Sequence, residues 1–397
     1  MKALICAEVY SANLGDGVIA DCLTHALLSG PFASEVCYFD LAGRSGYSSL
    51  GIRGTAIRAS RRHSIAFDAA RVAKVVARRW MPDGRSWASN LRRSIKASDA
   101  LLIGGGQLLI DNYLEFPVRI SDVVKAARAQ SKNVVFAFCG VGARWGRVAS
   151  RLFEQSLCDD RVKLIATRDA RSAERLQHRI PGVSTKTIAV ADPGVLADEV
   201  YTRSEKQFDL GLGVTEIGVL RRHSERHRSI STEALIERWV ELARLCCQHY
   251  ETALFTNGSP KDDQFARAVA DAFASRYGHR LILLPRATRP AELAAQISSF
   301  RMIVSHRLHA NILAYAFGVP SVALGWDDKL DSFMSLTERS HMLVRSPLPD
   351  AHEVARLLDG ISEPDVALHR VLKARVRAAA AELLSAASAE HTRAYDT

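Results

Sequence analysis

Residues 302–330, MIVSHRLHANILAYAFGVPSVALGWDDKL, decide the fold class of this chain. The apolar run Met302–Val304 predicts a buried strand, and Ser321–Leu324 predicts the next one. Between them, Ala310–Phe317 predicts an apolar helix, which Gly318 closes in the way that glycine commonly ends helices. A strand, a helix and a strand in this order predict a parallel α/β unit, and open sheets of that kind bind ligands at the carboxyl ends of their strands.

Three basic side chains of this unit, Arg307, His309 and Lys329, fall in its predicted loops. On a regular helix, positions i and i+2 point about 200° apart, so Arg307 and His309 converge only where the helix begins. Ser305 as the helix N-cap would place both side chains there. A helix N-terminus and an arginine fork together favour a phosphate or a carboxylate. A surface arginine beside a structural histidine is the alternative interpretation.

The length of 397 residues predicts two domains. The apolar share of 48% and the charged share of 24% are typical of a soluble globular enzyme, and no apolar run approaches the roughly 20 residues that span a bilayer. Seven scattered cysteines without a C-x-x-C pair indicate reduced thiols, so we expect a cytoplasmic protein. No His or Cys spacing is typical of zinc, and we expect no metal.

The net charge of +10 is concentrated in residues 44–98, which hold thirteen Lys or Arg and two acids. This segment predicts an amphipathic helix near Ile65–Trp80, a turn at Pro82–Gly84 and a further helix. A solvated basic face, an acidic glycan partner and a peripheral contact with an anionic membrane surface are the open interpretations. Nucleic acid is not expected, because no nucleic-acid-binding motif accompanies the charge. The expected membrane contacts are Arg61, Arg62, Arg78, Arg79, Arg92 and Arg93.

Strands and helices alternate through most of the chain, which predicts parallel sheets with short loops. The strands expected before the opening stretch are Lys2–Glu8, Glu35–Asp40, Asp99–Ile103, Val134–Phe138, Val162–Ala166, Thr187–Val190, Phe208–Val214, Thr252–Thr256 and Arg280–Leu284. A helix is expected from about Val18 to Leu28, and a polar basic loop at Arg221–Ser231.

The fold class that we expect is α/β, with two doubly wound Rossmann-like lobes that face a cleft. The first lobe comprises residues 1–203 with the basic helical insertion at 44–98, and the second comprises residues 204–348. Residues 349–397 are expected to form helices that could pack back on the first lobe.

Small and charged residues follow several predicted strands, and together they resemble one family. The pieces are Asn13-x-Gly15-Asp16, the triple glycine at 104–106, Gly140-x-Gly142, Arg168-Asp169-x-x-Ser172, Asp192-Pro193, and Arg307-Leu308-His309-Ala310 with Pro320 and Lys329. In this order they resemble the polysaccharide pyruvyltransferases over about residues 3–335. The resemblance implies a GT-B-like fold. It also implies transfer of pyruvate from phosphoenolpyruvate onto two hydroxyls of a sugar, in a cell-surface polysaccharide or its lipid-linked precursor, which forms a ketal.

The resemblance also implies roles for the site residues. Arg307, Lys329 and Arg168 would bind the carboxylate and the phosphate of phosphoenolpyruvate. His309 would deliver a proton, and Asp192 or Asp16 would act as the base, although capping a helix or a turn explains either carboxylate as well. The residues expected to bind substrate are Arg168, Lys329, Asn13, Gly15, Asp16, Gly104, Gly105 and Gly106. The triple glycine equally suits tight packing of a helix on a strand.

We therefore expect a cytoplasmic transferase of cell-envelope exopolysaccharide synthesis, in peripheral contact with the inner face of the membrane. Its donor substrate would be phosphoenolpyruvate, its acceptor a glycan, and it would need no cofactor. A GT-B glycosyltransferase with a nucleotide-sugar donor and a non-catalytic glycan-binding protein of the same fold are the alternatives.

Overall fold

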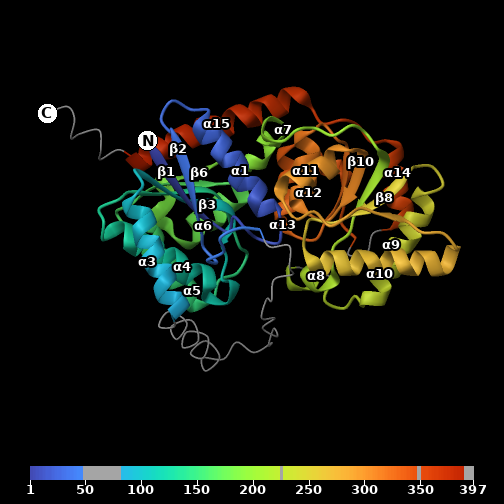
Figure 1. Ribbon diagram of the computed structural model, residues 1–397, viewed down its shortest axis with the longest axis horizontal. Helices are drawn as coiled ribbons and strands as arrows, with labels where there is room; N and C mark the ends of the chain where they lie inside the picture. The colour runs from blue at the N-terminus through green and yellow to red at the C-terminus, as the bar shows by residue number, and fades with distance from the viewer. Residues whose placement is uncertain (48–81, 224–226, 347–349, 389–397) are drawn as a thin grey trace.

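Two parallel sheets, each in a lobe of its own, form the protein (Figure 1). The structure is a computed structural model, and it describes residues 1–47, 82–223, 227–346 and 350–388. Each sheet has six strands, and helices cover both of its faces. The doubly wound α/β fold expected from the sequence is therefore confirmed. Among the described residues, no helix is both long enough and apolar enough to cross a membrane.

The first sheet has the strand order β2-β1-β3-β4-β5-β6. Its strands are β1 (Lys2–Ala7), β2 (Glu35–Asp40), β3 (Ala100–Leu109), β4 (Val134–Val141), β5 (Val162–Thr167) and β6 (Thr187–Ala189). The helices around it are α1 (Gly15–Leu28), α3 (Pro82–Lys96), α4 (Glu115–Arg128), α5 (Arg147–Leu157), α6 (Ala170–Arg179) and α7 (Ala197–Val200). Every residue of β4 is buried, as is usual for a parallel strand that has helices on both sides.

The second sheet has the order β12-β11-β10-β7-β8-β9. Its strands are β7 (Phe208–Gly213), β8 (Thr252–Phe255), β9 (Ile282–Leu283), β10 (Phe300–Ser305), β11 (Ser321–Leu324) and β12 (Leu343–Val344). Its helices are α8 (Ile217–His223), α9 (Thr232–Cys246), α10 (Pro260–Tyr277), α11 (Pro290–Ser298), α12 (Leu308–Ala316), α13 (Asp328–Leu336) and α14 (Ala351–Asp359). In each sheet the carboxyl ends of the parallel strands lie at one edge. The candidate site is built from residues that follow strands at these two edges.

The last helix, α15 (Val366–Ser388), crosses from the second lobe to the first along the top of Figure 1. It packs on α1 and against β3, β4 and β5. His369 Nε2 donates to the carbonyl oxygen of Val195 at 2.7 Å, and Lys373 pairs with Asp198 at 2.6 Å. This helix therefore ties the two lobes together, in addition to the chain segment that links β6 to β7.

Several elements differ in extent from the prediction. β3 does not end at Ile103: it continues through the triple glycine, because Gly104 pairs with Ala137 and Gly106 with Cys139 of β4. α1 begins at Gly15 instead of Val18.

Two segments expected to be irregular are partly helical. Pro82–Gly84 does not form a separate reverse turn. It is the first helical turn of α3, where proline is well tolerated. The predicted loop Arg221–Ser231 begins inside α8.

Most of the basic insertion lies outside the described residues. The helix expected near Ile65–Trp80 falls in this part, as do Arg61, Arg62, Arg78 and Arg79. Arg92 and Arg93 are described, and both are exposed on α3.

Candidate active site between the lobes

The start of α12 is one part of the second lobe that contacts the first lobe. Arg307, not Ser305 as expected, is the N-cap of this helix. Ser305 instead accepts a hydrogen bond from the Arg307 backbone N–H through Oγ at 3.1 Å, and its carbonyl oxygen accepts one from Asn311 Nδ2 at 3.1 Å. These two bonds fix the first turn, in which His309 is the second residue.

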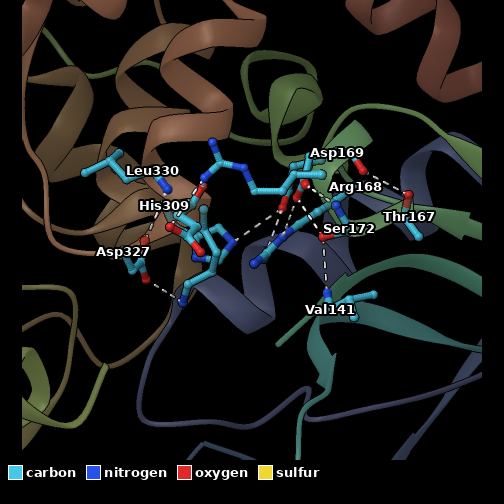
Figure 2. Close-up of polar contacts among 12 residues, drawn as sticks. Val141, Thr167, Arg168, Asp169, Ser172, His309, Asp327 and Leu330 are labelled. Atoms are coloured by element: carbon cyan, nitrogen blue, oxygen red, sulfur yellow. Dashed lines mark hydrogen bonds and ion pairs between the residues drawn. The ribbon is translucent and has the colours of Figure 1, made fainter. Parts of the chain in front are cut away.

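His309 meets two buried residues of the first lobe, Asp192 and Arg168. His309 Nε2 lies 3.8 Å from Asp192 Oδ2, and Arg168 Nη1 lies 3.9 Å from the same oxygen. The exposed fractions are 6% for His309, 3% for Asp192 and 5% for Arg168. Figure 2 shows His309 and Arg168 approaching each other from opposite lobes. One buried carboxylate thus lies between two basic groups at the junction of the lobes.

The environment of Asp192 keeps it ionised. Burial alone would raise its pKa, but His309, Arg168 and the backbone N–H of Gly194 together outweigh burial, so the pKa of Asp192 is lowered. The Gly194 N–H donates to Asp192 Oδ1 at 2.9 Å, which leaves Oδ2 for the two basic groups. The carboxylate is therefore held in its ionised form between the two basic groups.

Several buried polar atoms of this cluster have no hydrogen-bond partner among the described residues. They are Asp192 Oδ2, His309 Nε2, and Nε and Nη2 of Arg168. Buried donors are rarely left without an acceptor in folded proteins, so each such atom calls for an explanation. N–H groups of Arg168 in this position can bind an oxyanion of a substrate.

The turn between β5 and α6 holds Arg168 in place. Asp169 caps α6 by accepting from the Ser172 backbone N–H at 2.7 Å, and the Ser172 hydroxyl donates to the same carboxylate at 3.0 Å. Ser172 Oγ also accepts from the Val141 N–H of β4 at 3.1 Å (Figure 2). The guanidinium of Arg168 then lies over Gly140, where a Cβ would come within 2.7 Å of Nη2. The Arg-Asp-x-x-Ser spacing thus serves to orient the arginine.

The start of α1 brings Gly15 against the same histidine. A Cβ at Gly15 would overlap the His309 ring, so only glycine lets α1 and α12 approach this closely. Asn13 Nδ2 donates to Asp16 Oδ2 at 3.3 Å, and the Leu14 N–H donates to the Asn257 carbonyl of the other lobe at 3.2 Å. Asn13 and Asp16 therefore build the turn that positions Gly15, and Asp16 lies one residue from the His309 contact.

The triple glycine packs inside the first lobe. A Cβ at Gly104 would overlap the Ala137 carbonyl oxygen of β4. Gly105 and Gly106 have φ angles of +83° and +80°, which favour glycine, and they lie under the side chains of Ile19 and Asp16 on α1. The structure thus places these glycines where tight strand and helix packing requires them, and only Gly106 approaches another predicted site residue.

The other two expected donor ligands form ion pairs within the second lobe. Arg307 Nη2 pairs with Asp262, which is fully buried and also accepts from the Glu216 backbone N–H at 2.9 Å. Lys329 is not in a loop but in the first turn of α13, where it pairs with Asp327 Oδ2 at 2.9 Å. The structure therefore brings Arg168, Asp192 and His309 together, and it positions Arg307 through a carboxylate of its own lobe.

Asp328, next to Lys329, connects the lobes. Asp328 Oδ1 lies 3.3 Å from Arg171 Nη1, and Asp328 Oδ2 pairs with Arg175; both arginines are on α6 of the first lobe.

Two acids near the site were missed by the sequence analysis, Asp262 and Glu8. Glu8 follows β1 directly, and it accepts from Arg44 Nη2 at 3.2 Å. Burial first, and then the charges of Asp16 and Asp40, raise the pKa of Glu8 to about 7 against the opposing effect of Arg44. The signal available in the sequence was an acid at the carboxyl end of a buried parallel strand, where ligands bind.

Among the described residues, no three His, Cys, Asp or Glu side chains are grouped as ligands of a metal ion.

Solved structures with the same fold show how the lobes compare with known proteins. Staphylococcus aureus MnaA in complex with UDP superposes with a TM-score of 0.54 at 13% identity, over 96% of this chain and 94% of that one. A Listeria monocytogenes protein described as a UDP-N-acetylglucosamine 2-epimerase superposes with a TM-score of 0.56 at 12% identity, over 99% of this chain and 97% of that one. At these identities the likeness shows the fold alone, which is GT-B-like.

A search of curated protein sequences gives no match. The sequence model of one family, described as polysaccharide pyruvyl transferase, does match, and it covers residues 13–328. This range runs from Asn13 at the start of α1 to Asp328 at the start of α13, so it contains the Arg168–Asp192–His309 cluster. The chain belongs to the polysaccharide pyruvyl transferase family.

Proposed function

We propose that the protein transfers pyruvate from phosphoenolpyruvate onto two hydroxyls of one sugar in a cell-envelope polysaccharide or its lipid-linked precursor, and so forms a pyruvate ketal. Membership of the family makes the protein a transferase. The observation that carries the finer proposal is the buried cluster between the lobes, where Arg168 and His309 share one ionised carboxylate. A small donor that carries both a carboxylate and a phosphate needs such a set of fixed cationic groups, shielded from water.

The reaction needs one proton delivered to carbon and two removed from oxygen. Protonation of the methylene carbon, C3, makes C2 electrophilic, and the first sugar hydroxyl forms a C2–O bond as it loses its proton. The C2–O bond to phosphate then breaks, and the second hydroxyl closes the ketal and loses its own proton. One of the two hydroxyl protons replaces the proton spent at C3, and the other leaves with phosphate.

Each residue of the cluster has a role in this scheme. His309 delivers the proton to C3, since imidazole is the side chain best suited to proton transfer near neutral pH. Asp192 stays ionised, stabilises the imidazolium and orients it. Arg168 offers its buried N–H groups to the donor, and Arg307 adds a guanidinium at the N-terminus of α12.

Donor binding and turnover test the proposal together. Phosphoenolpyruvate should raise the melting temperature by several degrees, whereas UDP-sugars and GDP-sugars should not. Addition of a glycan acceptor should then release phosphate, and mass spectrometry should find the ketal on the glycan.

A melting shift with nucleotide sugars alone would replace this proposal with a glycosyltransferase. A shift with no donor, together with binding of glycans, would leave a non-catalytic glycan-binding protein. Loss of turnover in EDTA, restored by Mg²⁺ or Mn²⁺, would contradict a metal-free reaction.

We propose further that the enzyme works at an anionic membrane face, through the outer side of α3. The inner side of this helix buries Trp87, Leu91 and Ile95. Its exposed basic residues are Arg85, Arg92, Arg93 and Lys96. Each basic residue near an anionic surface contributes about 1 kcal/mol, and salt screens that attraction.

Vesicle binding tests this contact. Vesicles with anionic lipid should bind the protein, and the Arg92→Glu/Arg93→Glu variant should bind them less tightly. The control is Arg151→Glu, an exposed residue on α5. Equal binding to neutral and anionic vesicles would show that the face is only solvated.

A further inference from the structure

A cavity of about 550 Å³ opens beside α5 in the first lobe, apart from the Arg168–Asp192–His309 cluster. This volume lies within the range of about 300–1,000 Å³ that is usual for small-molecule sites. The charged, polar and aromatic residues of its wall are Asp111, Arg144, Trp145, Ser150, Glu154 and Arg179.

Trp145 is the aromatic wall of this cavity, and its position is fixed. Its Nε1 donates to the Leu109 carbonyl oxygen at 2.9 Å, and its ring packs on Phe153 with the ring centroids 4.5 Å apart. The guanidinium of Arg179 lies 4.6 Å from the centre of the indole. An aromatic side chain held in this way offers an apolar surface that loses little conformational freedom when a ligand packs on it.

The charges of the wall indicate the class of ligand. Two carboxylates, Asp111 and Glu154, and two guanidiniums, Arg144 and Arg179, balance each other. A sugar hydroxyl both donates and accepts hydrogen bonds, so a wall of mixed donors and acceptors beside an indole suits a neutral sugar. A wall whose charges balance gives a diphosphate or a uronate no net attraction.

One loop connects the cavity to the site between the lobes. Arg179 donates to the carbonyl oxygens of Gly142, through Nη1 at 2.7 Å, and of Ala143. Gly140, two residues earlier, lies against the guanidinium of Arg168. Three residues of extended chain span at most about 11 Å, so a glycan at Arg168 can reach the cavity with its adjoining residue.

We propose that this cavity binds a neutral sugar of the acceptor, namely the residue next to the one that receives pyruvate. The enzyme would therefore select oligosaccharide acceptors over the corresponding monosaccharides. The inference rests on the proposed function for its biological meaning, but the binding itself needs no donor and no turnover.

An array of neutral and acidic oligosaccharides, each beside its terminal monosaccharide, tests the proposal with phosphoenolpyruvate absent. The wild-type protein should retain at least one neutral oligosaccharide, at least tenfold more tightly than the matched monosaccharide. Glu154→Gln and Arg144→Gln should weaken this binding at least tenfold, and both residues are exposed, so the fold should tolerate these changes. Trp145→Phe keeps the packing on Phe153 and should weaken binding less than Trp145→Ala.

Two controls separate this inference from the proposed reaction. Glu174→Gln neutralises an exposed acid on α6 outside the cavity and should bind like the wild type. Glu237→Gln neutralises an exposed acid on α9 of the second lobe and should also bind like the wild type. If no oligosaccharide is retained, if only acidic ones are, or if the cavity variants bind like the wild type, the inference is wrong. Failure to consume phosphoenolpyruvate would instead contradict the proposed function alone.

Discussion

At the residue scale, the 3.8 Å separation of His309 and Asp192 predicts a kinetic signature. His309→Asn keeps a hydrogen-bonding side chain of similar size but cannot transfer a proton near neutral pH. We expect kcat to fall by about 10²- to 10⁴-fold with little change in the KM for phosphoenolpyruvate, and the basic limb of the pH profile to flatten.

Arg307→Lys serves as the comparison, because it loses the planar fork and should mainly raise the donor KM. If His309→Asn instead raises KM and spares kcat, then His309 only orients its neighbours.

The raised pKa of Glu8 predicts the acidic limb of the pH profile of activity. We assign the base to Glu8, which follows β1 at the carboxyl edge of the sheet and senses the charge of Asp16 at the start of α1. A base must be deprotonated to accept a hydroxyl proton, and burial raises the pKa of Glu8 to about 7, so activity should rise as the pH increases through 7. Glu8→Gln should lower kcat at least about 100-fold and remove that acidic limb from the residual activity. Glu35→Gln, at the opposite end of the first sheet, is the control and should leave the profile unchanged. An acidic limb that survives in Glu8→Gln would assign the base to another group.

The buried pair of Arg307 and Asp262 predicts a loss of stability. Asp262→Asn leaves the guanidinium without its counter-charge, and removal of one partner of a buried pair costs about 3 kcal/mol. Urea denaturation measures the free energy of unfolding. Asp263→Asn is the matched control: its partner Arg267 is 63% exposed, so that pair should contribute less than about 1 kcal/mol. If both variants lose the same free energy of unfolding, the buried pair contributes no more to stability than the exposed pair.

At the element scale, the close contact of α1 with α12 should make activity sensitive to substitution of Gly15. Alanine is the better helix former by about 1 kcal/mol, so Gly15→Ala should not unfold α1. Its Cβ would overlap the His309 ring, and displacing a catalytic group by about 1 Å can cost about 100-fold in rate. Gly30→Ala, just beyond the other end of α1, meets only atoms at 3.5 Å or more and should keep full activity. Full activity in Gly15→Ala, measured by phosphate release, would contradict this arrangement.

Some elements could be read from the sequence because their ends carry clear local signals. β2 spans Glu35–Asp40 and β11 spans Ser321–Leu324, as predicted, and Gly318 ends the helix before β11 with a φ angle of +65°. β3 was predicted too short because the glycines 104–106 look like a loop. Their backbone groups nevertheless pair with β4, and no local pattern reveals that pairing.

The site was predictable as a set of residues but not as an arrangement. Arg168, Asp192 and His309 each follow a strand that could be recognised, so each was identified. Their meeting at one carboxylate oxygen depends on how the two lobes approach each other, which no local spacing determines. The pairing of Arg307 with Asp262 was also hidden, because the two residues lie 45 positions apart in the sequence and meet only when the second lobe folds.

At the scale of the whole molecule, two further groups of contacts join the lobes besides the packing of α1 on α12. α15 and the segment that links β6 to β7 join them along one side, where Tyr201 OH donates to Asp21 at 2.7 Å. Near the site, Asp328 of α13 binds Arg171 and Arg175 of α6. The first region is continuous with the covalent chain, whereas the second depends on side chains that can separate. The ion pairs of Asp328 are therefore a contact that should break if the lobes move apart.

Asp328→Lys should move the lobes apart without unfolding either one. The side chains of Asp328 and Arg171 are 47% and 44% exposed, so water screens their attraction and the loss of stability should stay below about 1 kcal/mol. Three cations at the junction would nevertheless repel each other across the site. Small-angle X-ray scattering should show a larger radius of gyration, and the KM for phosphoenolpyruvate should rise.

The triple variant Asp328→Lys/Arg171→Glu/Arg175→Glu reverses the signs and should restore both values. Glu241→Lys, which disrupts an exposed pair within α9, is the control and should change neither. An unchanged radius in Asp328→Lys would mean that the other contacts between the lobes hold them at this separation.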